Sequence, residues 1–106
     1  MEDQMPILSL RGGFLKYERA CDEFRYLGYP LALTKTERQI LARLMQHSDE
    51  YCAPETLYEG ILEHSADPKG LVRAHVSHIN EKAFAIGERK LIESRKNIGY
   101  KISFSL

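Results

Sequence analysis

Four apolar residues separated by four, three and four positions constrain this chain more than any other feature. They are Val72, Val76, Ile79 and Ala83. At about 100° per residue these side chains fall within a narrow arc of an α-helix, which makes one face apolar and leaves the other polar. Asp67 is a favoured N-cap residue, and Pro68 suits a first helical position. The spacing therefore predicts a helix over about 68–85, ended by Gly87, with one buried face and one free face.

Two further helices are predicted before this one. Thr34 and Glu37 form a capping box, in which the hydroxyl accepts from the Glu37 N–H and the carboxylate reaches back. This first helix covers about 35–47. A proline begins a second helix over about 54–63, but Ala53 before it offers no side-chain oxygen as a cap. The apolar positions of the two helices are Ile40, Leu41, Leu44 and Met45, then Leu57, Tyr58, Ile61 and Leu62.

Short apolar segments separated by turn residues lie on either side of the helices. The N-terminal segments are 7–10, 14–17, 23–27 and 30–33, and the C-terminal pair, 91–95 and 100–104, flanks a turn at 96–99. A turn is predicted at Gly28 and Tyr29. On either side of it apolar residues recur with a period of two, which indicates one buried sheet face; they are Phe24, Tyr26, Leu31 and Leu33. The sequence therefore predicts an α+β fold with a small antiparallel sheet, three helices and a terminal β-hairpin.

Length and composition fit one domain. A chain of 106 residues can bury a core of its own, so we expect a single domain over 1–106, with 1–5 disordered. No run approaches the roughly 18 apolar residues of a membrane span, and the acidic start lacks the features of a secretory signal. An even count is weak evidence for a disulfide between Cys21 and Cys52. We expect a cytoplasmic protein whose cysteines are core or boundary residues.

Charge is distributed unevenly along the chain. The formal net charge is zero, which argues against a general polyanion binder, since nucleic-acid-binding domains are commonly basic. Residues 1–66 nevertheless hold 7 Lys and Arg against 11 Asp and Glu, a net −4, and residues 67–106 hold 8 against 4, a net +4. The C-terminal third therefore favours a local anion-binding face, with chance clustering on a solvated surface as the alternative.

Three motifs resemble one family in order and spacing. Segment 33–37 (LTKTE) is similar to the signature that opens the first helix of the C-terminal DNA-binding domain of OmpR/PhoB-type response regulators. Segment 72–82 (VRAHVSHINEK) resembles the recognition helix of that family, and 92–102 (IESRKNIGYKI) resembles its wing, which ends on glycine-tyrosine. The likeness covers about 6–104 and implies a winged helix-turn-helix in a two-component system, either taken from a longer response regulator with a preceding receiver domain or standing alone.

The resemblance implies sequence-specific binding to duplex DNA by a bacterial transcriptional regulator. The third helix is then expected in the major groove and the wing on the adjacent minor groove or backbone. Base edges would be contacted by Ala74, Ser77 and His78, and phosphates by Lys69 and Arg73 from the helix and by Arg95 and Lys96 from the wing. The alternative is that these side chains are only the solvated face of an amphipathic helix and a solvated turn.

Further partners follow from the same resemblance. Relatives bind direct repeats head to tail, so tandem half-sites and a head-to-tail dimer on DNA are expected. The loop Glu63 to Asp67 corresponds to a segment that in relatives can touch RNA polymerase. No cofactor and no membrane contact are expected.

Several positions depart from the family pattern. Asn80 stands where an arginine is usual, which removes an expected phosphate contact, and Glu81 stands where a basic residue is common. Arg73 replaces a common aspartate, a change that favours DNA. Asn97 replaces a usual glycine in the wing turn, where asparagine tolerates positive φ. Neutral total charge, Asn80 and Glu81 support a second hypothesis, a winged helix that acts as a protein-interaction module with weak or no DNA binding.

Metal and enzyme functions find little support in the sequence. His75, His78 and Glu81 recur at i, i+3 and i+6, but the HExxH arrangement and a nearby cysteine are missing, and the family resemblance accounts for His75. The chain has no glycine-rich phosphate loop or nucleophile elbow. We therefore expect neither an enzyme nor a metal site. Core positions, rather than base-stacking ones, are expected for Phe14, Tyr17, Phe24, Tyr26, Phe84 and Phe104.

Overall fold

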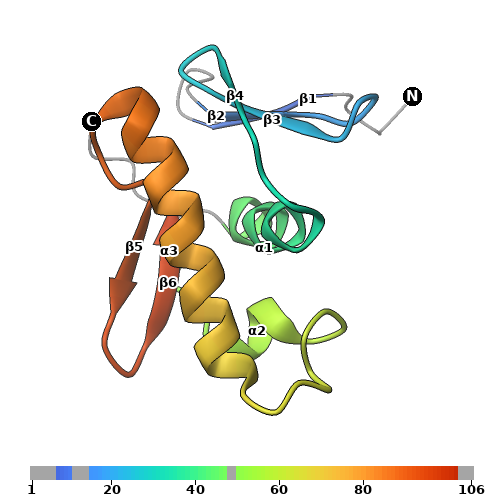
Figure 1. The fold of residues 1–106 in the computed structure, drawn as a ribbon, viewed down its shortest axis with the longest axis vertical. Coiled ribbons are helices and arrows are strands. Elements are labelled where there is room, and N and C mark those ends of the chain that lie inside the picture. The colour runs from blue at the N-terminus through green and yellow to red at the C-terminus, as the bar shows by residue number, and fades with distance from the viewer. Residues whose placement is uncertain (1–6, 11–14, 48–49, 103–106) are drawn as a thin grey trace.

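The computed structural model describes residues 7–10, 15–47 and 50–102. Its elements in chain order are β1 (Ile7–Leu10), β2 (Leu15–Glu18), β3 (Glu23–Tyr26), β4 (Tyr29–Leu31), α1 (Lys35–Gln46), α2 (Pro54–Tyr58), α3 (Pro68–Gly87), β5 (Ile92–Arg95) and β6 (Gly99–Ile102). In Figure 1 the N-terminal sheet lies at one end of the molecule and α2 at the other, with α1 between them and α3 running beside the β5–β6 hairpin. The predicted α+β winged-helix architecture is confirmed.

The N-terminal strands form one antiparallel sheet in the order β1-β2-β3-β4. The predicted period of two is confirmed, because Phe24, Tyr26 and Leu31 are all buried on the face toward the helices. The turn lies one residue earlier than predicted, at Leu27 and Gly28, whose φ values are 53° and 87°. Two successive residues with positive φ match the twist of a two-residue hairpin, so Tyr26 pairs directly with Tyr29.

The capping box at the start of α1 is confirmed. The Thr34 hydroxyl accepts from the Glu37 N–H at 3.2 Å, and the Glu37 carboxylate accepts from the Thr34 N–H at 3.0 Å. The four predicted apolar positions of α1 are all buried. The helix ends at Gln46, within one residue of the predicted end.

Helix α2 is shorter than predicted, ending at Tyr58 instead of near residue 63. Glu59 leaves the helical region with ψ at 127°, and Gly60 has a φ of 77°. A glycine adopts this left-handed conformation readily, so the chain turns away from the helix axis here. Of the predicted buried stripe only Leu57 is fully buried, and Ala53 makes no side-chain cap, as predicted.

The predicted buried face of α3 is confirmed at all four positions, and Asp67 caps the helix by accepting from the Gly70 N–H at 3.2 Å. The helix ends at Gly87, as predicted, although this glycine is not the left-handed residue of the C-terminal cap. Gly87 is the last helical residue, and Glu88 takes the left-handed conformation with φ at 59°. A Cβ on Gly87 would lie 2.9 Å from Leu27 Cδ1 and 3.0 Å from the Tyr26 ring. This glycine lets α3 approach the N-terminal sheet closely.

The C-terminal hairpin pairs Ile92 with Ile102 and Arg95 with Gly99. Asn97 in its turn has a φ of 65°, which is the conformation predicted to be tolerable there. Cys52 forms an isolated antiparallel bridge with Tyr100 of β6. Its carbonyl accepts from the Tyr100 N–H at 2.9 Å, and its own N–H donates to the Tyr100 carbonyl. A Cβ on Gly99 would lie 2.0 Å from the Cys52 carbonyl oxygen, so only glycine fits here. Predicted strand residues 103–104 lie outside the described residues.

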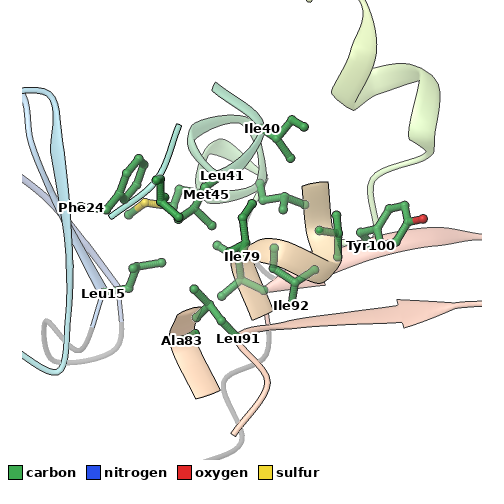
Figure 2. Packing of buried hydrophobic residues seen from close by; sticks show 14 of the residues in the cluster. Leu15, Phe24, Ile40, Leu41, Met45, Ile79, Ala83, Leu91, Ile92 and Tyr100 are labelled. Atoms are coloured by element: carbon green, nitrogen blue, oxygen red, sulfur yellow. The ribbon is translucent and has the colours of Figure 1, made fainter. Parts of the chain in front are cut away.

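One hydrophobic core joins the sheet, the helices and the hairpin (Figure 2). Two expectations about individual residues are wrong. Phe84 is 54% exposed although it was expected in the core, and Cys21 is exposed although it was expected at the core or its boundary. Cys52 is buried, and both cysteines are free thiols. Phe14 and Phe104 lie outside the described residues.

Among the helices of the described residues, none combines the length and the apolar character that crossing a membrane requires.

Candidate nucleic-acid interface

The free face of α3 holds the predicted helix contacts. Arg73, Ala74, Ser77 and His78 are all exposed, as is Glu81 on the same side. Val72 and Val76 lie on the opposite, buried face. The helix therefore separates its packing residues from its free residues as the apolar spacing requires.

A groove of about 650 Å³ lies between the start of α3 and the hairpin turn. Four of the seven predicted site residues line it. Lys69 and Arg73 come from α3, and Arg95 and Lys96 come from the hairpin. Residues more than 20 positions apart in sequence therefore bring their positive charges to one concave surface, where an anion would be attracted from several sides.

Two contacts orient parts of this basic groove. The Lys69 ammonium lies 3.4 Å from a carboxylate oxygen of Glu55, which also lines the groove. The Arg95 guanidinium lies over the Tyr51 ring, 5.6 Å from its centroid. Tyr51 is itself fixed by its hydroxyl, which donates to Glu93 at 2.6 Å. Sequence reasoning missed Tyr51, because its partners are more than 40 residues away along the chain.

Asn80 holds the hairpin against α3. Its Oδ1 accepts from the N–H groups of Leu91 and Ile92 at 3.0 and 2.8 Å, and its Nδ2 donates to the Ile92 carbonyl at 2.9 Å. From the sequence, Asn80 was interpreted as a lost phosphate contact and as support for a protein-interaction module. The half-buried amide instead holds the start of β5 against α3, and it thereby positions the wing relative to the free face of the helix.

Glu37 joins the start of α1 to the middle of α3. This carboxylate is only 2% exposed, and the Lys82 ammonium donates to its Oε1 at 2.7 Å. Its Oε2 lies 3.6 Å from His78 Nδ1 and 3.9 Å from His75 Nδ1. Burial alone would raise the pKa of Glu37, but the hydrogen bonds from Lys82 and the Thr34 N–H, with the nearby positive charge, hold it below its ordinary value. The carboxylate is therefore ionised at neutral pH.

A second hollow of about 320 Å³ follows the later turns of α3. Exposed Phe84 lines it together with Glu81 from the helix and Lys90 from the segment before β5. An exposed aromatic side chain in a hollow is a feature of protein contact surfaces as well as of base stacking.

The chain is similar to known transcriptional regulators in sequence. The family described as transcriptional regulatory protein, C terminal, matches residues 28–102. The transcriptional activator protein PfeR of Pseudomonas aeruginosa is 28% identical over 101 residues, which are 92% of this chain and 33% of that protein. The chain thus spans about a third of the length of this curated relative.

Solved structures share the fold. The DNA-binding domain of RstA from Klebsiella pneumoniae, solved with the RstA box, superposes with a TM-score of 0.74 at 18% identity, over 93% of this chain and 98% of that one. DrrB, an OmpR/PhoB homologue from Thermotoga maritima, superposes with a TM-score of 0.77 at 20% identity, over 95% of this chain and 46% of that one. Both likenesses show the architecture that the sheet, the helices and the hairpin form here.

Proposed function

The chain belongs to the family of C-terminal domains of transcriptional regulatory proteins, of the OmpR/PhoB type, and from this premise we propose that it binds duplex DNA in a sequence-specific way. The observation that carries the proposal is the basic groove between α3 and the hairpin. Lys69, Arg73, Arg95 and Lys96 line it. Phosphate contacts supply most of the affinity of such domains, and they require positive charge on the surface that meets the backbone.

In the proposed complex α3 lies in the major groove of B-DNA, which is wide enough to admit one helix. Ala74, Ser77 and His78 then face the base edges, because they are exposed on the side of α3 opposite Val76. Ser77 and His78 carry hydrogen-bonding groups for base readout, and Ala74 is short enough to allow close approach. Lys96 at the hairpin turn reaches the adjacent minor groove or its phosphates. The DNA-bound structure of the RstA domain supports this arrangement by its similar fold.

Fluorescence anisotropy with a labelled random duplex at low salt tests the proposal. We expect saturable binding that weakens as salt increases, because released counterions drive association. Arg73→Ala should weaken this binding, whereas Arg19→Ala, a matched loss of one exposed arginine in the turn between β2 and β3, should not. The absence of binding at low salt, or equal losses in the two variants, would contradict the proposal. A selection from random duplexes would then report the preferred site.

The alternative, a protein-interaction module, is favoured by one specific observation. Phe84 is 54% exposed and lines the second hollow with Glu81. A Phe84→Ser variant separates the hypotheses, because a protein-binding surface centred on an aromatic side chain loses affinity for its partner when that side chain is truncated. DNA affinity should be nearly unchanged in Phe84→Ser if the basic groove is the binding site.

Two finer features remain proposals that derive from family membership. Two copies are proposed to bind direct repeats head to tail, with half-sites about one helical turn apart. The segment Glu63 to Asp67, which lies between α2 and α3, is proposed as a contact for RNA polymerase. Its Glu63, His64 and Asp67 side chains are exposed. Gel mobility on duplexes with one and two selected sites would test the first proposal, and reconstituted transcription with Glu63→Ala would test the second.

A further inference from the structure

A cluster of metal-binding side chains spans the contact between α1 and α3. One ligand atom from each of Glu37, His75 and His78 lies within 4.8 Å of the other two. From this geometry we propose that Glu37, His75 and His78 bind one divalent transition-metal ion, with Zn²⁺ as the best chemical match. In the sequence, His75 and His78 were considered together with Glu81 as the carboxylate, and no metal site was expected there. Glu81 is exposed on the free face of α3. The carboxylate that lies beside the two imidazoles is instead the buried one of Glu37.

The distances fit coordination by one ion. Zn²⁺ binds imidazole nitrogen at about 2.0–2.1 Å and carboxylate oxygen at about 2.0–2.2 Å, so neighbouring ligands of a tetrahedral ion lie roughly 3.3 Å apart. Glu37 Oε2 lies 3.6 Å from His78 Nδ1 and 3.9 Å from His75 Nδ1. The histidine nitrogens lie within 4.8 Å of each other, so a side-chain movement of up to about 1.5 Å would complete the site. His75 and His78 are one helical turn apart, which keeps both imidazoles on the same side of α3.

The hydrogen bonds around the cluster involve the carboxylate oxygen of Glu37 that lies away from the two imidazoles. Glu37 Oε1 is occupied, since it accepts from both Lys82 and the Thr34 N–H, so these bonds hold the carboxylate with Oε2 toward the imidazoles. His75 Nδ1 is buried and has no hydrogen-bond partner among the described residues. A buried polar atom without a partner is costly. An ion between this nitrogen and Glu37 Oε2 would give the buried nitrogen a partner.

The donor set also indicates which ions fit. Two imidazoles and one carboxylate oxygen suit Zn²⁺ and its neighbours in the first transition row. Mg²⁺ and Ca²⁺ prefer sites made of oxygen ligands alone, and here Lys82 occupies the second carboxylate oxygen. Three protein ligands leave the remaining position for water, because the His78 side chain is 55% exposed and reaches solvent.

Bound metal would affect the free face of α3. His78 is one of the residues proposed to read base edges, so an ion that holds its imidazole toward Glu37 would remove it from the DNA. This coupling to DNA rests on the proposed function, whereas metal binding itself does not. The test is therefore made first on the protein without DNA.

The experiment is calorimetric titration of the untagged chain with ZnCl₂ near neutral pH. It uses a Cys21→Ser background, because Cys21, Glu18 and Glu23 form a second group of potential ligand atoms. We expect one Zn²⁺ per chain, a higher melting temperature with Zn²⁺ and no comparable effect of Mg²⁺. Co²⁺ in place of Zn²⁺ should give visible absorption bands of a low-coordinate site.

The matched variants are His78→Ala and His64→Ala, which each remove one exposed histidine. His78→Ala should weaken Zn²⁺ binding by about tenfold or more. A loss of this order is expected because mutating even the residues that hydrogen-bond to a metal ligand lowers metal affinity by about tenfold or more. His64→Ala should leave affinity unchanged. No binding at millimolar Zn²⁺, or equal affinity in His78→Ala and its parent, would overturn the proposal. Duplex affinity with and without Zn²⁺ then tests the coupling separately, and its failure would leave the metal site standing.

Discussion

The two halves of α3 use their polar residues in opposite ways. In residues 68–77 the polar side chains Lys69, Arg73 and Ser77 are exposed, and the packing contacts are made by valines. In residues 78–87 two polar side chains, those of Asn80 and Lys82, contact other elements of the molecule instead. Asn80 bonds the backbone of β5 and Lys82 bonds Glu37 of α1. The first half is free to meet a partner, and the second half fixes the elements around it.

This difference explains why departures from the family pattern do not all concern DNA. Asn80 replaces a usual basic residue, and by charge alone it counts as a lost phosphate contact. In the structure its amide satisfies three backbone groups at the point where the chain enters the wing. Buried backbone groups require partners, so this position carries a structural demand of its own.

The largest expected effect concerns the buried apolar face of α3. Ile79→Ala should lower the free energy of unfolding by about 2–5 kcal/mol, because it leaves a cavity at a position that is fully buried. Ser77→Ala, two residues earlier on the exposed face, should change it by less than about 0.5 kcal/mol. Urea denaturation measures both values. Similar losses in the two variants would contradict the assigned faces of the helix.

The Asn80 clamp should contribute the next largest effect. Asn80→Ala leaves the backbone N–H groups of Leu91 and Ile92 without their acceptor, and the expected loss is about 1–3 kcal/mol. Glu81→Ala removes a neighbouring exposed side chain and serves as the control. Amide hydrogen exchange should also show faster exchange at Leu91 and Ile92 in Asn80→Ala. Unchanged protection there would show that the amide does not hold the hairpin.

Local signals predicted most of the fold. Thr34 with Glu37 marked the start of α1, Asp67 marked the start of α3, and the four spaced apolar residues identified its buried face. These features depend on residues within one or two helical turns of each other, so they can be recognised in the sequence. The resemblance to a known family then supplied the candidate site, and four of its seven residues line one groove.

The errors concern contacts between residues far apart in sequence. Glu37 and Lys82 are 45 positions apart, and their pairing depends on how α1 and α3 pack. Gly87 was interpreted as a helix terminator, although it permits the close approach of Leu27 and Tyr26. Phe84 was placed in the core because it lies beside the end of a helix, but its position on α3 faces solvent. No periodicity within one segment reports such partners.

Removing the N-cap of α1 should lower the free energy of unfolding by less than removing either buried contact in the second half of α3. Thr34→Ala removes the acceptor for the Glu37 N–H, and the expected cost is about 1 kcal/mol. Thr34→Ser keeps a hydroxyl and should retain most of the stability. Urea midpoints that place Thr34→Ala below Ile79→Ala would contradict the ranking of core above cap.

Substitutions of the exposed side chains at 69–78 of α3 and in the wing should change DNA binding and not stability. Arg73→Ala or Lys96→Ala should each reduce the slope of log affinity against log salt by roughly 0.9, and weaken binding to all duplexes alike.

Ser77→Ala or His78→Ala should instead narrow the difference in binding free energy between the selected site and random duplex, because base contacts carry about 1–3 kcal/mol of discrimination each. Lys16→Ala on β2 is the control for loss of an exposed lysine. Equal salt slopes for Lys96→Ala and Lys16→Ala would exclude the wing from the interface.

The smallest expected effect is at Glu81, where the free face continues into the second half of α3. Glu81 is exposed beside Ser77 in the second hollow, so its negative charge would lie near DNA phosphates and oppose binding. Glu81→Lys should tighten binding by a few tenths of a kcal/mol, since exposed charge contacts contribute little individually, and the gain should fade as salt screens it. Glu81→Gln should give an intermediate value. Anisotropy titrations at about 50 mM salt, where the Debye length exceeds 10 Å, measure the difference. If Glu81→Lys and Lys96→Ala both leave affinity unchanged, neither α3 nor the wing meets DNA, and the protein-interaction hypothesis takes its place.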